Sequence, residues 1–199
     1  EFSGEVLPTD GAEIYLRPDL TLKPVKAYVW ENVEGATADQ YGKVVVKREY
    51  KPGEEMTIHK GENLVVDFGQ NCAAVPSFEF CAKEGTKLTC LVAESLNDGN
   101  GAKSRGIDGP EGSIHRLNLR IPDTGMRMTY TFADTKKPAT FMPTNTFFGY
   151  RLVSITATDD VKIKSIASVP VTSIARNMET GILTTGNELI NRLISNTVW

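Results

Sequence analysis

The residues best suited to chemistry are a few carboxylates and amides near the middle of the chain. Asp67, Gln70 and Asn71 follow an apolar run of strand-forming residues, and Glu94 ends a second such run. Planar amides and carboxylates match the vicinal hydroxyls of a sugar, so these four are candidate carbohydrate-binding residues. A structural role is the alternative: Asp67 and Asn71 can satisfy backbone groups at a tight corner, and Glu94 can pair with a nearby base.

Acid–base catalysis on a sugar is the most specific chemistry that these carboxylates could perform. Glycoside hydrolysis usually requires two carboxyl groups on either side of the glycosidic bond. The isolated acids in or beside predicted strands are Asp67, Glu79, Glu94 and Asp134. The sequence alone does not bring two of them into one cleft, and neither His59 nor His115 has a serine or cysteine placed as a partner. We therefore assign no catalytic residue.

Metal binding has weaker support. Oxygen ligands of the kind that calcium prefers occur in the glycine-rich stretch 97–112, namely Asn97, Asp98, Asn100 and Asp108. Their spacing does not match the standard calcium-binding loop, so we predict no metal and no other cofactor. Cys72, Cys81 and Cys90 match no zinc pattern of close pairs, and we expect them to be small buried apolar residues.

Alternating apolar and polar residues predict short strands along most of the chain. We place them near 24–33, 44–50, 56–59, 64–68, 78–82, 88–93, 114–121, 128–132, 150–156 and 161–171. So many short strands separated by turn signals favour an all-β fold, an antiparallel β-sandwich of jelly-roll type. Apolar residues at helical spacing behind Thr185 or Asn187 predict one short C-terminal helix, with a stripe that includes Leu189 and Leu193.

Turn residues predict how some of these strands connect. The apolar run 64–68 should end at Gly69, because glycine adopts backbone angles that a side chain forbids. The segment Lys83-Glu84-Gly85-Thr86 has hairpin length, so we expect the strands on either side of it to pair. The strand at 56–59 is expected to pair forward with the strand at 64–68.

Composition narrows the possible partners. With 199 residues, of which 40% are hydrophobic, the chain can bury a substantial core. The formal net charge is −3 and the basic side chains are scattered, so we predict no nucleic-acid partner. No stretch predicts a membrane span or a signal segment, and Glu1-Phe2-Ser3-Gly4 has the character of an internal start. Tyr28, Trp30 and Tyr41 could stack on sugars, but such strand aromatics more often lie in a core or interface.

The order of several modest motifs resembles a known family. The sequence 67–71 is Asp-Phe-Gly-Gln-Asn, followed by Gly85-Thr86, by Ala93-Glu94 and by an acidic, glycine-containing loop at 97–99. The stretches 141–153 and 185–199 continue the series. Over roughly positions 60 to 199 this series resembles the β-sandwich domain that precedes the catalytic (α/α)6 barrel of bacterial α-L-rhamnosidases. Two stretches depart from the family pattern, Cys72-Ala73-Ala74 and Phe148-Gly149-Tyr150-Arg151.

The resemblance implies an accessory domain of a hydrolase that removes terminal α-L-rhamnose from glycans. It implies an arm or linker at 1–20, a sandwich at 21–180, and a linker with the start of the helical domain at 181–199. The catalytic acid and base would lie in that barrel, beyond Trp199, so we expect this chain alone to be inactive. The implied partners are the protein's own barrel and a rhamnosylated glycan, and the implied location in a bacterium is periplasmic or extracellular.

Two other functions remain open from the sequence. One is a carbohydrate-binding module that uses the 97–112 loop and nearby strand ends. The other is a cell-surface adhesion sandwich with no catalytic parent.

Overall fold

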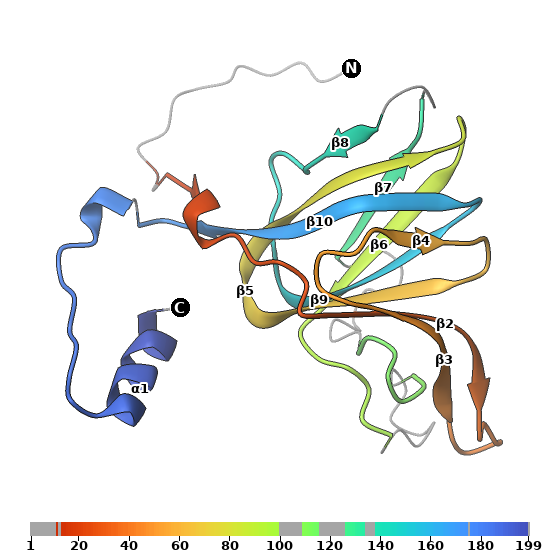
Figure 1. Ribbon diagram of the computed structural model, residues 1–199, viewed down its shortest axis with the longest axis horizontal. Helices are drawn as coiled ribbons and strands as arrows, with labels where there is room; N and C mark the ends of the chain where they lie inside the picture. Colours follow the sequence, from red (N-terminus) through yellow and green to blue (C-terminus); the bar gives the residue numbers. More distant parts are fainter. Residues whose placement is uncertain are drawn as a thin grey trace.

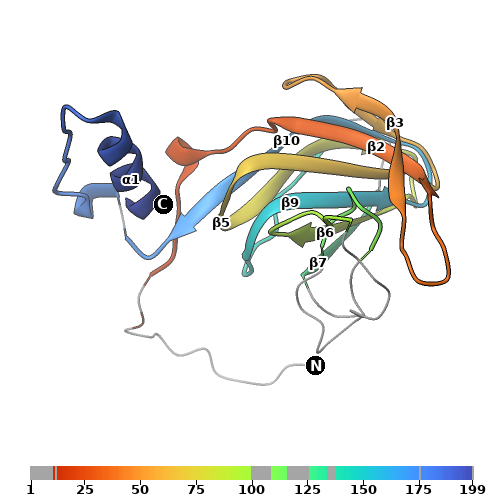
Figure 2. The same ribbon diagram turned by 90° about the horizontal axis from the view of Figure 1, so that it is seen from below.

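The structure is a computed structural model that describes residues 11, 13–99, 109–115, 126–133, 138–174 and 176–198. Its strands are β1 (Tyr15–Leu16), β2 (Lys26–Glu34), β3 (Lys43–Tyr50), β4 (Met56–Ile58), β5 (Asn63–Ala82), β6 (Lys87–Ala93), β7 (Arg127–Thr131), β8 (Ala139–Phe141), β9 (Phe148–Ala157) and β10 (Val161–Thr172). The helical elements are η1 (Pro18–Leu20), η3 (Arg176–Met178) and α1 (Glu188–Val198). The strand pairings are antiparallel, and Figures 1 and 2 show them curled into one sheet that folds over itself. The predicted all-β sandwich with a short C-terminal helix is confirmed.

The long strand β5 joins the two layers of the sandwich. Its first part pairs with β2 and β9, in the layer that also contains β3, β6 and β7. Its second part, from Ala74 onward, pairs with β10 and β8, and β1 and β4 lie along β10. Against β9, the register of β5 shifts between Asp67 and Cys72, where the strand bends. This bend positions the polar residues singled out in the sequence.

The prediction that the strand ends at Gly69 is wrong. Gly69 has a φ of +77°, yet β5 continues through it for 20 residues in all. Glycine allows a bend within a strand as readily as a turn after it, and the neighbouring strands keep the backbone paired on both sides. The sequence pattern therefore located the change of direction correctly and misjudged its nature.

Two predicted pairings are also wrong. Lys83 and Thr86 form the expected tight turn, with the Thr86 N–H donating to the Lys83 carbonyl at 3.1 Å. The strands that it joins do not pair, because β5 pairs with β10 and β8 at its end while β6 pairs with β7 and β9. The turn is an arch from one layer to the other. Likewise β4 pairs with β10 instead of with the strand that follows it.

The main core lies between the two layers. Leu64, Val66 and Phe68 of β5 point into it, as do residues of β6, β9 and β10. Phe80 contacts Phe132 with ring centroids 4.8 Å apart, an edge-tilted arrangement that aromatic rings favour. Cys90 is buried as predicted, whereas Cys72 and Cys81 are half-buried, and all three are free thiols. Burial of this apolar surface is the main stabilising contribution to the sandwich.

A second cluster covers the opposite face of the β5 and β9 layer. It contains Tyr28, Val44, Val65, Ala93, Ile114 and Leu152, with Trp30 packed against it. Val65 belongs here because neighbouring residues of a strand point to opposite faces. The two β2 aromatics thus pack within the protein, as strand aromatics usually do. The predicted strand at 114–121 lies largely outside the described residues.

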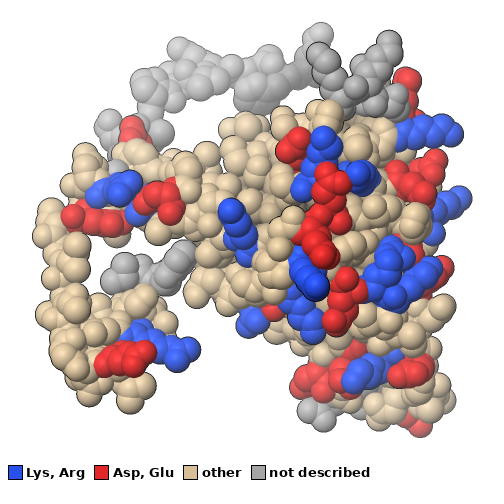
Figure 3. Space-filling view, viewed as in Figure 1, with Lys and Arg blue, Asp and Glu red and all other residues tan. Residues whose placement is uncertain are grey.

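Beyond β10 the chain contains η3, and an extended stretch then leads to α1 (Figures 1 and 2). Asn187 caps α1, since its side-chain oxygen accepts hydrogen bonds from the N–H groups of Leu189 and Ile190 at 3.0 and 3.4 Å. Within the described residues no helix has the length and apolar character that crossing a membrane requires. Figure 3 shows charged side chains gathered over β10, β4 and β2, whereas the sandwich nearer α1 is mostly uncharged.

Candidate functional site

The bend in β5 brings Asp67 against Arg151 of β9. The Arg151 guanidinium donates two hydrogen bonds to the Asp67 carboxylate, from Nε and from one terminal nitrogen, each at 2.8 Å. The same carboxylate accepts the Gly69 N–H at 2.7 Å, so Asp67 also closes a local turn over the glycine. A two-pronged arginine contact of this kind fixes geometry as well as charge. Asp67 therefore holds the bend on both sides.

The other three predicted residues lie near the same bend. Asn71 donates a hydrogen bond from its side-chain nitrogen to Oε1 of Glu94 at 3.1 Å, which links β5 to the end of β6. The Gln70 side chain donates to the Asn71 carbonyl at 3.0 Å. Asn71 and Glu94 are exposed, whereas Asp67 and Gln70 are half-buried. The structural alternative expected Asn71 to satisfy a backbone group and Glu94 to pair with a base. The two side chains bind each other instead.

The electrostatics of the bend favour the ionised forms of Asp67 and Arg151. Burial opposes ionisation of Asp67, but the hydrogen bonds from Arg151 and the Gly69 N–H outweigh it and lower the pKa of this carboxyl. The same ion pair raises the pKa of Arg151. Burial, with a smaller contribution from the Asp67 charge, raises the pKa of Tyr28 to about 12. Asp67 is consequently an anion at neutral pH, the wrong form for a general acid.

In the stretch 97–115, the described residues 97–99 and 109–115 meet at a buried asparagine. Asn97 is 6% exposed, and its amide nitrogen donates to Ser113 Oγ at 2.9 Å and to the Ile114 carbonyl at 3.1 Å. Its amide oxygen lies 3.0 Å from Nδ1 of His115. These contacts hold Ile114 over the second cluster, which is a structural role for Asn97. Two of the other loop residues considered for calcium, Asn100 and Asp108, lie outside the described residues.

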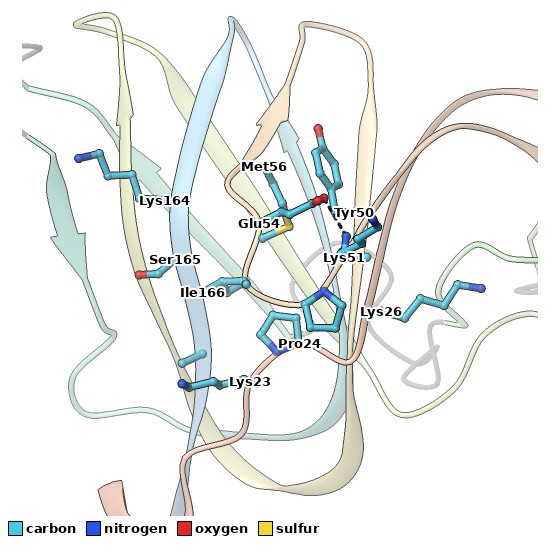
Figure 4. Close-up of a pocket in the computed structure, with 14 residues that line it drawn as sticks. Lys23, Pro24, Lys26, Tyr50, Lys51, Glu54, Met56, Lys164, Ser165 and Ile166 are labelled. Atoms are coloured by element: carbon cyan, nitrogen blue, oxygen red, sulfur yellow. Dashed lines mark hydrogen bonds between the residues drawn. The ribbon is translucent and has the colours of Figure 1, made fainter.

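A hollow of about 350 Å³ lies between the β2–β3 and β4–β10 strands, and none of the bend residues described above lines it. Pro24, Met56 and Ile166 give it an apolar lining, and its lysines are Lys23, Lys26, Lys51 and Lys164. Figure 4 shows Lys23 and Lys164 leaving on one side and Lys26 on the other, so these amines do not converge on one point. Sequence reasoning missed this hollow because its residues are scattered along the chain without a spacing that signals a site. Elsewhere in the described ranges no three His, Cys, Asp or Glu side chains gather as metal ligands would.

Comparison with known proteins identifies the fold that carries these residues. Residues 58–172 match the family model described as the bacterial alpha-L-rhamnosidase concanavalin-like domain. The chain belongs to this family. The match runs from the end of β4 to the end of β10, so it includes Asp67, Glu94 and Arg151 in the concanavalin-like domain.

Curated relatives bear the same family name. The chain is 29% identical over 143 residues to an alpha-L-rhamnosidase of Formosa agariphila and 28% identical over 142 residues to one of an Alteromonas strain. These alignments cover 71% and 69% of this chain but only 14% and 13% of the relatives. Among solved structures, a rhamnosidase from Klebsiella oxytoca with rhamnose bound matches 81% of this chain and 30% of its own, with a TM-score of 0.51 and 11% identity. That likeness concerns the fold alone.

Proposed function

We propose that this chain is the β-sandwich accessory domain of an α-L-rhamnosidase, and that it supports a catalytic domain which hydrolyses terminal α-L-rhamnose. The observation that carries the proposal is the family match over residues 58–172. This chain matches only 14% and 13% of the curated relatives, both alpha-L-rhamnosidases, which leaves most of each relative for other domains.

The chemistry of the bend supports a non-catalytic role. Inverting or retaining hydrolysis needs a protonated carboxyl group and a second carboxylate facing each other across the sugar. Asp67 is ionised and held by Arg151, and Glu94 accepts a hydrogen bond from Asn71. Neither carboxyl group lines the hollow described above. In this proposal the general acid and the group that activates water belong to the catalytic domain.

The proposal assigns a part to each region of the chain. Residues 21–180 form the accessory sandwich, 1–20 an arm, and 181–199 the linker and the start of a helical catalytic domain. The partner of the sandwich is then that domain within the same polypeptide. In this proposal the protein acts in the periplasm or outside a bacterial cell, which is the location that the resemblance to bacterial α-L-rhamnosidases implies.

The test compares the 199-residue chain with the protein extended through the region after α1. We expect the extended protein to release p-nitrophenol from p-nitrophenyl α-L-rhamnoside, and the 199-residue chain to release none. Release by neither would contradict the assigned substrate. Release by the short chain would put the active site in the sandwich.

A second candidate function is sugar binding at the β5 bend, favoured by the exposure of Asn71 and Glu94 side by side. Calorimetric titration with rhamnose and rhamnosylated oligosaccharides, with and without calcium, tests it. Saturable binding that Glu94→Gln abolishes, and that Glu84→Gln in the distant arch leaves unchanged, would establish this function. Flat titrations would remove it.

A further inference from the structure

An uncharged groove lies at the end of the sandwich where the chain departs toward α1. It has a volume of about 450 Å³, and none of the residues that line it is ionisable. Ile14 and Leu16 form one wall, and Met142 and Phe147, from the segment between β8 and β9, form the other. Val75 and Val171 belong to the strands β5 and β10 beneath it.

The walls of this groove are unusually apolar for a surface in contact with water. Ile14 is 59% exposed and Phe147 46% exposed, and Leu16 and Met142 are each more than a third exposed. Contiguous exposed apolar side chains mark interaction sites in proteins that are otherwise well solvated. In the lysine-rimmed hollow, by contrast, the apolar lining residues Met56 and Ile166 are buried. The groove therefore has the composition of a surface that becomes covered.

The groove is tied to the start of the linker. Leu16 of β1 pairs with Val171 of β10. The next residue, Arg17, is buried, and its guanidinium binds Asp19 at 2.9 Å and Glu179 beyond η3. Its N–H donates to the Pro170 carbonyl at 2.8 Å. This arginine clamp fixes where the chain leaves the sandwich, next to the groove.

Apolar side chains continue along the linker and α1. Ile182 is 98% exposed, and Leu183, Leu189 and Leu193 are each exposed by more than half. In α1 the apolar residues Leu189, Ile190 and Leu193 recur at helical spacing, so they form one stripe. A helix with an uncovered stripe of this kind normally packs against further structure.

We propose that the groove is the docking surface for an uncharged, apolar helical face of the domain that begins with α1. This inference rests on the proposed function, in which that domain follows in the same polypeptide. The covalent linker supplies a high effective concentration, so a modest apolar contact is enough to hold the domains together. An uncharged groove also selects an uncharged partner, because a charged group buried there would lose its water without gaining a counter-ion.

Hydrogen–deuterium exchange measured by mass spectrometry tests the contact directly. We expect backbone amides at 139–147 to exchange more slowly in the extended protein than in the 199-residue chain. Amides at 43–50 in β3, on the far side of the sandwich, should exchange equally in both proteins. Equal exchange at 139–147 would overturn the proposal.

A matched pair of variants separates docking from folding. Phe147→Asp in the extended protein should lower the temperature of thermal inactivation by a few degrees and should leave the Tm of the 199-residue chain unchanged. The control Val45→Asp, an exposed apolar residue of β3, should change neither. If Phe147→Asp lowered the inactivation temperature of the extended protein and the Tm of the 199-residue chain equally, Phe147 would serve folding alone. That result would contradict docking.

Two further outcomes identify the cause of a failure. If the 199-residue chain dimerises in light scattering and Phe147→Asp makes it monomeric, the groove binds a second copy and the assigned occupant is wrong. If the extended protein hydrolyses the rhamnoside but shows no protection at 139–147, the proposed function stands and the docking surface falls. Protection without hydrolysis would leave the docking surface standing and contradict the function.

Discussion

Arg151 and Asp67 join β9 to β5 through two parallel hydrogen bonds of 2.8 Å at the point where β5 bends from one layer of the sandwich to the other. The pair lies within the stretch that matches the family, beside the register shift between the two strands. The polar residues at the bend, which are candidates for sugar binding from the sequence, thus include an ion pair that joins two strands.

Replacing the arginine should loosen the bend. Arg151→Lys keeps the positive charge but loses the two-pronged contact, so we expect a loss of about 1 kcal/mol in the free energy of unfolding. Urea unfolding at pH 7 measures it. Arg127→Lys, an exposed arginine of β7, is the control and should have no effect. If the free energy of unfolding fell in both variants, or in neither, the Arg151–Asp67 pair would have no specific role.

The bend should also be sensitive to its glycine. A Cβ on residue 69 would lie 3.2 Å from the side chain of Val25 and would require a φ of +77°. Gly69→Ala should therefore cost about 1–2 kcal/mol for the backbone conformation and a further amount for the contact. Gly53→Ala is the matched control, because its φ is +86° and its Cβ would meet nothing within 4 Å. Chemical denaturation should give the larger loss at position 69, and equal losses would remove the argument from the contact.

A buried acid, Glu62, forms another two-pronged ion pair outside the bend, with Arg48. It is 1% exposed and accepts hydrogen bonds from Arg48 at 2.6 and 2.9 Å and from the His59 N–H at 2.9 Å. Glu62→Gln leaves the Arg48 charge without its counter-ion, so we expect a loss of about 3 kcal/mol. The exposed Glu49→Gln in β3 should be neutral. A loss below 1 kcal/mol in urea unfolding of Glu62→Gln would show that water replaces the carboxylate.

Low pH should destabilise the sandwich by protonating the carboxylates of Glu62 and Asp67. Hydrogen bonds from Arg48 lower the pKa of Glu62, and those from Arg151 and Gly69 lower that of Asp67 against the effect of burial. A carboxyl group whose folded pKa is lowered stabilises the fold above its unfolded pKa, near 4, and loses that contribution as the pH falls. The free energy of unfolding should thus fall between pH 5 and pH 2, and less steeply in Glu62→Gln. Identical slopes for the variant and the wild type would contradict the assignment to Glu62.

Asn97, which the sequence offers as a possible calcium ligand, should contribute to stability instead. Asn97→Ala leaves buried polar groups of Ser113 and Ile114 without their donor, which costs about 2 kcal/mol. The exposed Asn71→Ala should cost little. The midpoint of thermal unfolding compares the two variants. A larger effect at position 71 would reverse the assignment of structural and exposed roles.

Sequence patterns predicted the class of fold well, because alternation of apolar and polar residues is a local property of each strand. Residues 128–132, 150–156 and 161–171 were placed as strands, and β7, β9 and β10 occupy those positions. Pairing between strands is not local. The glycine turn at 83–86 is compatible with a hairpin and with an arch, and the choice depends on which neighbours already occupy the edges of β5. No local signal distinguishes them.

The candidate site was predicted in part. Asp67, Gln70 and Asn71 can be grouped from the sequence because they lie within five positions of one another. Glu94 lies beside them only because β6 pairs with β9 in the observed register. Arg151, the partner of Asp67, was missed as a site residue since it lies 84 positions away in the chain. The groove at the linker was not foreseen either. Its walls come from four separated apolar residues that carry no spacing signal.

If this sandwich supports the catalytic domain of a rhamnosidase, removing it should impair the enzyme. Hydrolysis of p-nitrophenyl α-L-rhamnoside and the temperature of thermal inactivation should be measured for the extended protein with and without residues 21–180. We predict that the shortened protein loses activity or inactivates at a clearly lower temperature. Unchanged turnover and an unchanged inactivation temperature would contradict the claim.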